Sequence, residues 1–166
     1  EIMSVQITIV GMGQIGASVG LALANHKELV QRTGHDRDYQ VARLAEKMGA
    51  VDQISHNLPS SVKDADIVLL ALPADQIYDA LQLVASELKE NAVIMDTAPV
   101  KESMIQWAQE LLPAGRHYVG LTPVINPSYL YNREKGIEAA RAPGRRMRRT
   151  AWIAPQKSAL RKHTRN

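Results

Sequence analysis

The chain has 166 residues, of which 45% are hydrophobic, no cysteine and a formal net charge of +3. This length corresponds to one ordinary globular domain, no apolar stretch is long enough to cross a bilayer, and no basic segment followed by an apolar run marks a secretory signal. The absence of cysteine excludes disulfides and cysteine–metal sites, and these features together predict a cytoplasmic protein.

Strands and helices alternate along the chain in the hydrophobic pattern. The predicted strands are Val5–Val10, Thr33–Asp36, Val51–Ile54, Asp66–Leu72, Ala92–Met95 and His117–Leu121. The predicted helices are Gln14 to about Asn25, Tyr39–Met48, Asp75–Leu88, and Pro99 to about Leu112 with the proline in the first turn. This alternation predicts an α/β fold of the Rossmann type, a doubly wound and mainly parallel sheet with helices on both faces. Ligands of such sheets bind beyond the carboxyl ends of the strands.

A glycine-rich turn after the first strand is the most specific motif. Gly11, Gly13 and Gly16 form a Gly-x-Gly-x-x-Gly pattern between a predicted strand and a predicted helix. In this pattern the first glycine permits a tight turn, the second leaves room for a pyrophosphate, and the third allows close packing of the helix. Gln14 and Ile15 begin the helix, whose free N–H groups and partial positive charge attract phosphate. The motif predicts a dinucleotide-binding site.

The residues after the second strand indicate which dinucleotide is bound. Asp36 has the spacing of the acid that accepts hydrogen bonds from the adenosine ribose hydroxyls. Its negative charge would repel a 2′-phosphate, so we expect NAD rather than NADP. Arg37 could stack on the adenine, compensate the charge of Asp36, or be an ordinary surface charge.

Two later strand ends complete the predicted cofactor site. Leu72 and Pro73 end the apolar strand, and Thr97 follows the next one. Lys101, in the first turn of the following helix, could position an anionic substrate or phosphate, or be solvated. The histidines show no spacing suited to a metal ion, so no metal site is predicted.

Four segments of the chain resemble the prephenate and arogenate dehydrogenases. Gly-Met-Gly-Gln-Ile-Gly-Ala-Ser at 11–18 resembles the family's glycine motif, and Asp-Ile-Val-Leu-Leu-Ala-Leu-Pro at 66–73 resembles its acid-led strand. Asp-Thr-Ala-Pro-Val-Lys at 96–101 is similar to Asp-x-x-Ser-Val-Lys, and Tyr-Val-Gly-Leu-Thr-Pro at 118–123 lies where the family has Val-Gly-Gly-His-Pro. The resemblance extends over about residues 5–140.

The resemblance implies a nucleotide-binding domain followed by a helical domain that dimerises and completes the active site. Together these oxidise a cyclohexadienol with NAD or NADP and release carbon dioxide, while a histidine helps to remove the hydroxyl proton. This chain has Thr122 at the position of that histidine and Pro99 at the position of an active-site serine. Neither side chain can replace an imidazole as a base, and 166 residues leave no room for the helical domain. The resemblance therefore implies the family's cofactor site for this chain, whereas the catalytic residues stay unknown.

The sequence thus predicts the NAD(P)-binding domain of a prephenate dehydrogenase-like oxidoreductase of tyrosine biosynthesis. A related β-hydroxyacid or pyrroline-carboxylate-type reductase is one alternative. A non-catalytic nucleotide-binding or interaction module is another, favoured by the loss of the histidine and serine. The expected partners are a nicotinamide dinucleotide, a small anionic substrate and a second copy of the chain, with no membrane and no nucleic acid.

The composition changes after residue 140. We predict a Rossmann domain over 1–140 and a basic tail over 141–166, which holds nine Lys or Arg and no Asp or Glu, leaving 11 basic and 17 acidic residues in the rest. Tyr129–Ala142 could form a helix, and 150–155 a last short strand. Three interpretations of the tail stay open: a frayed and solvated terminus, a nucleic-acid-binding arm, or a disturbed reading frame near Ala142.

Overall fold

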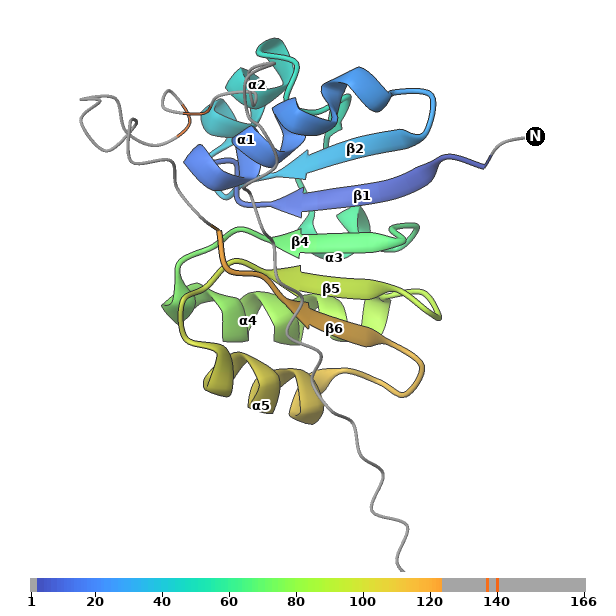
Figure 1. Ribbon diagram of the computed structural model, residues 1–166, viewed down its shortest axis with the longest axis vertical. Coiled ribbons are helices and arrows are strands. Elements are labelled where there is room, and N and C mark those ends of the chain that lie inside the picture. The colour runs from blue at the N-terminus through green and yellow to red at the C-terminus, as the bar shows by residue number, and fades with distance from the viewer. Residues whose placement is uncertain (1–2, 124–136, 138–139, 141–166) are drawn as a thin grey trace, which may run out of the picture.

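A six-stranded sheet with helices on both faces forms the molecule (Figure 1). The computed structural model describes residues 3–123, 137 and 140. The strands are β1 (Val5–Val10), β2 (Val30–His35), β3 (Gln53–Ile54), β4 (Ile67–Leu70), β5 (Val93–Asp96) and β6 (His117–Gly120). The helices are α1 (Gln14–Leu23), α2 (Tyr39–Lys47), α3 (Leu58–Ser61), α4 (Ala74–Val84) and α5 (Lys101–Leu111), with 3-10 turns at Ala24–His26 and Ala85–Glu87.

All neighbouring strands pair in parallel, in the order β3-β2-β1-β4-β5-β6. The order reverses between β1 and β4, which is the switch point at which doubly wound sheets bind their ligands. The predicted Rossmann-type fold is therefore confirmed. No helix of the described part of the chain is long and apolar enough to cross a membrane.

The core is divided into two clusters by the sheet. On one face, Met12 of the glycine turn and Ala17 of α1 pack with Ile9 of β1. On the other face, helices α4 and α5 pack against the inward side chains of β4 and β5, of which Val68 and Ile94 are fully buried. Continuous apolar runs such as Ile67–Leu70 form these strands because both faces of a parallel sheet are covered.

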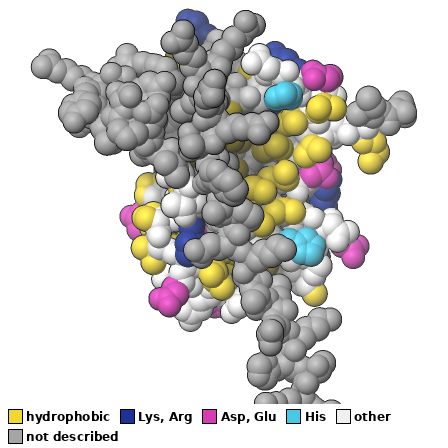
Figure 2. Space-filling view, in the orientation of Figure 1, with side chains coloured by type: hydrophobic (Ala, Val, Ile, Leu, Met, Phe, Trp, Pro, Cys, Tyr) yellow, Lys and Arg dark blue, Asp and Glu magenta, His cyan; other side chains and the backbone are white. Residues whose placement is uncertain are grey.

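Helices α1 and α2 cover one face of the sheet over β1, β2 and β3 (Figure 1). Over β4, β5 and β6, the same face is covered by other residues. Figure 2 shows hydrophobic side chains gathered over β1, β4 and β5 on this side. Ile67, Met95 and Val119 are half-buried there. Ile137 and Ala140, only 7% and 2% exposed, pack into the same cluster. The remaining residues of the predicted segments Tyr129–Ala142 and 150–155, and the predicted boundary at 140, lie outside the described residues.

Several predicted bounds differ from the structure, and one helix was not predicted. Strand β2 begins at Val30 rather than Thr33, because its pairing with β1 in the register Val5↔Val30 outweighs the polarity of its first residues. Pro99 does not lie in the first turn of a helix, since α5 begins at Lys101 after a turn held by a carboxylate. The sequence analysis missed α3, a four-residue helix too short to show periodicity, although the side chain of Asn57 caps it.

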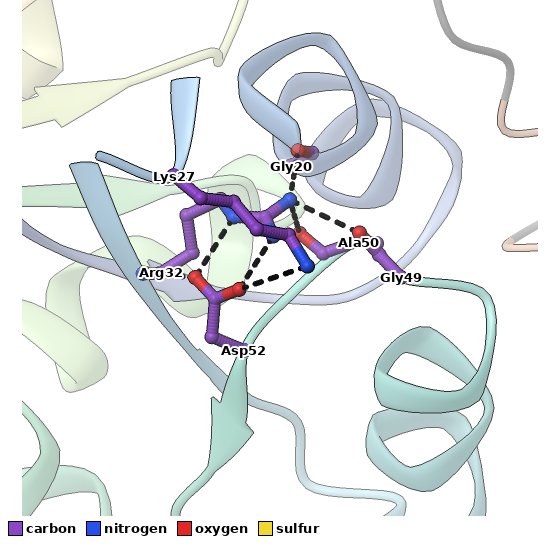
Figure 3. Close-up of polar contacts among 6 residues, drawn as sticks. All are labelled: Gly20, Lys27, Arg32, Gly49, Ala50 and Asp52. Atoms are coloured by element: carbon purple, nitrogen blue, oxygen red, sulfur yellow. Dashed lines mark hydrogen bonds and ion pairs between the residues drawn. The ribbon is translucent and has the colours of Figure 1, made fainter. Parts of the chain in front are cut away.

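A buried arginine connects β2 to α1 and to the turn that follows α2 (Figure 3). The Arg32 side chain is fully buried, and its Nη1 donates to the carbonyl oxygens of Gly20, Gly49 and Ala50 at 2.7, 3.0 and 3.1 Å. Its Nε and Nη2 donate to the Asp52 carboxylate at 3.1 and 2.7 Å. Arg32 therefore fixes the C-terminal half of α1 and the turn that follows α2 relative to the sheet.

Stability is expected to fall in acid because two carboxylates form ion pairs. The hydrogen bond from Arg32 lowers the pKa of Asp52 below its ordinary value of 3.8, and the hydrogen bond from Lys89 does the same for the pKa of Asp66. A depressed pKa stabilises the folded state above about pH 5, and this contribution is lost as the pH falls through the lowered value. We expect the thermal midpoint to drop steadily below about pH 4. Melting curves of the wild type and of Asp52→Asn test this, because the variant should show a flatter dependence, and identical profiles would contradict the assignment.

Candidate dinucleotide-binding site

The segments predicted to bind a ligand meet at one edge of the sheet. Because all strands are parallel, the turns after β1, β2, β4 and β5 lie together at their carboxyl ends (Figure 1). The glycine turn follows β1, Asp36 and Arg37 follow β2, Leu72 and Pro73 follow β4, and Thr97 follows β5. The switch point between β1 and β4 lies at the centre of this edge.

The three glycines of the turn face different surroundings. Gly11 has a φ of +92°, and a Cβ there would lie 2.4 Å from the carbonyl oxygen of Ala71. A Cβ at Gly16 would lie 1.9 Å from the carbonyl oxygen of Gly11, so this glycine allows α1 to pack on the turn itself. A Cβ at Gly13 would meet nothing within 4 Å. The first and third glycines are thus required by the protein, whereas the second borders open space.

The N-terminus of α1 has no side-chain cap among the described residues. Gly13 is its N-cap and provides no side-chain acceptor, and the first turn contains no acidic residue. The first N–H groups of a helix have no partner within the helix, and they carry its partial positive charge. Gln14 and Ile15, both half-buried, begin this turn. The space beside Gly13 and these uncapped N–H groups fit a pyrophosphate.

Asp36 connects the glycine turn to the loop after β2. Its Oδ2 accepts a hydrogen bond from the Met12 backbone N–H at 2.8 Å, and its Oδ1 accepts one from the Asp38 N–H at 2.9 Å. An ionised carboxylate offers about four acceptor positions, so two stay available for ribose hydroxyls. Arg37 is exposed and forms no ion pair with another described residue.

The end of β4 forms the central wall of the edge. Leu72 is partly buried against the core on the α4 face, and its Cδ2 lies 2.9 Å from the position that a Cβ of Gly11 would take. Pro73 is exposed and is the N-cap of α4. Thr97, 8% exposed, is fixed beside this wall because its N–H donates to the Leu70 carbonyl oxygen at 3.3 Å.

Lys101 is not positioned as a free anion contact. Its Nζ lies 2.8 Å from Oδ1 of Asp96, whose residue is only 1% exposed, and 3.4 Å from the Asp96 carbonyl oxygen. The Tyr118 hydroxyl donates to the other oxygen of this carboxylate. Burial and this hydrogen bond raise the pKa of Tyr118. Sequence reasoning assigned no role to Asp96 or Tyr118. The segment 96–101 places an Asp at a strand end five residues before a Lys, which is a signal for that pair, whereas no spacing points to Tyr118.

The described part of this edge offers no imidazole near β5 and β6. Thr122 and Pro99 are both exposed. His35 lies at the end of β2 and its Nδ1 is 2.8 Å from the Ser55 carbonyl oxygen, while His117 is at the opposite end of β6. In the described residues, no three His, Asp or Glu side chains form a group suited to a metal ion. The described part of the edge therefore holds an uncapped helix N-terminus and no imidazole beside the carboxyl ends of β5 and β6.

Comparison with known proteins adds an independent line of support. The family model "Prephenate dehydrogenase, nucleotide-binding domain" matches residues 19–145, beginning after the glycine motif. The prephenate dehydrogenase of Bacillus subtilis is 28% identical over 136 residues, which are 81% of this chain and 35% of that protein. The structure of Synechocystis arogenate dehydrogenase has a TM-score of 0.70 and 25% identity, covering 82% of this chain and 45% of that chain.

A second solved structure, prephenate dehydrogenase from A. aeolicus in complex with hydroxyphenyl propionate and NAD+, is 21% identical with a TM-score of 0.70 and covers 84% of this chain and 46% of that chain. The chain therefore spans less than half the length of these relatives. The family model covers most of the chain, and its match does not depend on the glycines that first suggested a nucleotide. The chain belongs to the family of prephenate dehydrogenase nucleotide-binding domains.

Proposed function

We propose that this chain binds NAD at the carboxyl edge of its sheet, as the cofactor-binding part of an oxidoreductase. The observation that carries the proposal is the open space at Gly13, beside the uncapped N-terminus of α1 and within the same turn that Asp36 contacts. Family membership supports a nucleotide as the ligand. The A. aeolicus relative, which was crystallised with NAD+, supports this particular nucleotide.

Each predicted residue has a proposed role in holding the dinucleotide. The backbone of the turn and of the first residues of α1 binds the pyrophosphate, and Asp36 binds the adenosine ribose. The residues proposed to line the site are Gly11, Gly13, Gln14, Ile15, Gly16, Asp36, Arg37, Leu72, Pro73 and Thr97. When bound, the nicotinamide ring would accept a hydride. The protein's own contribution is to fix the two ends of the dinucleotide on either side of the switch point.

Calorimetric titration with NAD and with NADP tests the proposal. We expect saturable binding of NAD and weaker binding of NADP, because the Asp36 carboxylate would face a 2′-phosphate. Asp36→Ala should weaken NAD binding by about 1–3 kcal/mol, the loss expected for charged hydrogen bonds. Lys63→Ala serves as the control, because Lys63 is an exposed charge that pairs with Glu87 and is not among the proposed site residues. Failure of the wild type to bind either dinucleotide would overturn the proposal.

We propose further that the described residues do not carry out proton removal from a cyclohexadienol. Thr122 and Pro99 are exposed and occupy the positions that the family resemblance assigns to a histidine and a serine. A hydroxyl without an activating base does not accept a proton near neutral pH. This observation favours the second candidate function, a nucleotide-binding module that binds NAD without turnover. Formation of NADH from prephenate by this chain alone would contradict it.

A β-hydroxyacid or pyrroline-carboxylate-type reductase shares the fold, but the family match favours the prephenate dehydrogenase family. Cytoplasmic location, a small anionic substrate and pairing with a second copy stay predictions from the sequence. A substrate screen and a sedimentation measurement on the chain joined to a helical second domain would address the last two.

A further inference from the structure

A buried polar cluster lies on the β5 side of the proposed cofactor site. It consists of Asp96, Lys101 and Tyr118, which we call the Asp96 cluster. Asp96 is 1% exposed, and the Lys101 side chain is only 11% exposed. The Asp96 carboxylate accepts hydrogen bonds from the Lys101 ammonium group at 2.8 Å, from the Tyr118 hydroxyl, and from the Ala98 backbone N–H at 2.8 Å. Its charge is therefore compensated and its oxygens are occupied entirely from within the protein.

The cluster joins three elements at the carboxyl edge. Asp96 ends β5, Lys101 is the first residue of α5, and Tyr118 lies on β6. Packing is tight around it, since a Cβ at Gly120 would lie 3.0 Å from Cδ of Lys101 and 3.2 Å from the Tyr118 hydroxyl oxygen. The backbone of Asp96 also accepts a hydrogen bond from the Leu121 N–H at 2.8 Å. One carboxylate thus fixes where β5, β6 and α5 meet.

The segment that the cluster constrains is the short turn from Thr97 to Val100. The bond from Ala98 to Asp96 closes the first part of this turn, and Lys101 holds its other end. Thr97 lies inside it, beside the end of β4. The turn therefore has little freedom, although Pro99 and Val100 are exposed.

Topology assigns this turn to one half of the dinucleotide. Asp36 after β2 lies on one side of the glycine turn, and β4 and β5 lie on the other side of it. A dinucleotide that lies across the switch point places its two nucleosides on opposite sides. With the adenosine at Asp36, the nicotinamide nucleoside falls over the ends of β4 and β5, against the turn that contains Thr97.

We propose that Lys101, acting through Asp96, is a positioning residue for the nicotinamide half of the cofactor rather than a direct contact to substrate or phosphate. This inference rests on the proposed binding of NAD. Removing the ammonium leaves a buried carboxylate without its counter-charge, and the turn that Asp96 shapes must rearrange. The adenosine half of the site lies on the far side of the glycine turn and keeps its geometry.

Titration of variants with NAD and with adenosine diphosphate, which lacks the nicotinamide riboside, tests the proposal. Lys101→Met should weaken NAD binding about tenfold and adenosine diphosphate binding less than about twofold. Lys101→Arg should restore most of the NAD affinity, because it supplies a cation to the same carboxylate. Tyr118→Phe keeps the ion pair and serves if the methionine variant folds poorly, with an expected loss of about threefold for NAD.

Lys89→Met is the matched control, because Lys89 forms a 2.6 Å ion pair with Asp66 just before β4 begins, away from the proposed site. It should leave the affinity for both ligands unchanged. Equal losses for NAD and adenosine diphosphate, or no loss for NAD, would overturn the positioning role while leaving NAD binding established. If the wild type binds neither ligand, the proposed function and this inference both fall.

Discussion

Replacing Arg32 by methionine is expected to lower the free energy of unfolding by about 3–5 kcal/mol, the cost of breaking a buried ion pair by removing one partner. The guanidinium is fully buried and donates to three carbonyl oxygens as well as to Asp52. Methionine keeps an unbranched apolar stem but has no donor, so the carbonyl oxygens of Gly20 and Ala50 would lose this partner in the interior. Urea unfolding followed by circular dichroism measures the change.

An exposed ion pair supplies the control for Arg32. Nζ of Lys63 lies 3.3 Å from Oε2 of Glu87, and the two side chains are 57% and 34% exposed. Lys63→Met should cost less than about 1 kcal/mol, because exposed ion pairs contribute little. A loss of less than about 1 kcal/mol for Arg32→Met would show that the connection between β2, α1 and the turn after α2 is not a main source of stability.

Replacing Gly13 by valine is expected to reduce the affinity for NAD about 100-fold or more while the fold is kept. Gly13 has a φ of −73° and a ψ of −161°, an extended conformation that any residue adopts, and a Cβ there meets no protein atom within 4 Å. The added methyl groups would instead occupy the space beside the N-terminus of α1, where the pyrophosphate must approach the backbone. Gly13→Ala should give a smaller loss, and titration of both variants measures the series.

Gly16, the third glycine of the motif, serves as the comparison, because a substitution there should change stability and not ligand access. A Cβ at Gly16 would lie 1.9 Å from the carbonyl oxygen of Gly11, so Gly16→Ala should lower the thermal midpoint itself. Wild-type affinity in a folded Gly13→Val variant would falsify the idea that the open position beside Gly13 receives the cofactor.

Local sequence patterns predicted the alternation of strands and helices along the chain and most of the individual elements. The run Ile67–Leu70, the helix Tyr39–Lys47 and the glycine turn each lie close to where periodicity and turn chemistry indicate. These features depend on neighbours in sequence, since a helix face or a turn conformation is set within a few residues. Because parallel strands place their carboxyl ends at one edge, the location of the candidate site followed from the fold class as well.

The sequence by itself determined the Rossmann-type fold and the edge at which a ligand would bind, because both arise from short-range patterns. Only the tertiary structure decided what the charged side chains do. Arg32 is hidden in the interior and Lys101 is turned toward Asp96, whereas Arg37 stays exposed. A charged residue becomes buried only where distant segments supply its hydrogen-bond partners, and no local pattern specifies those partners.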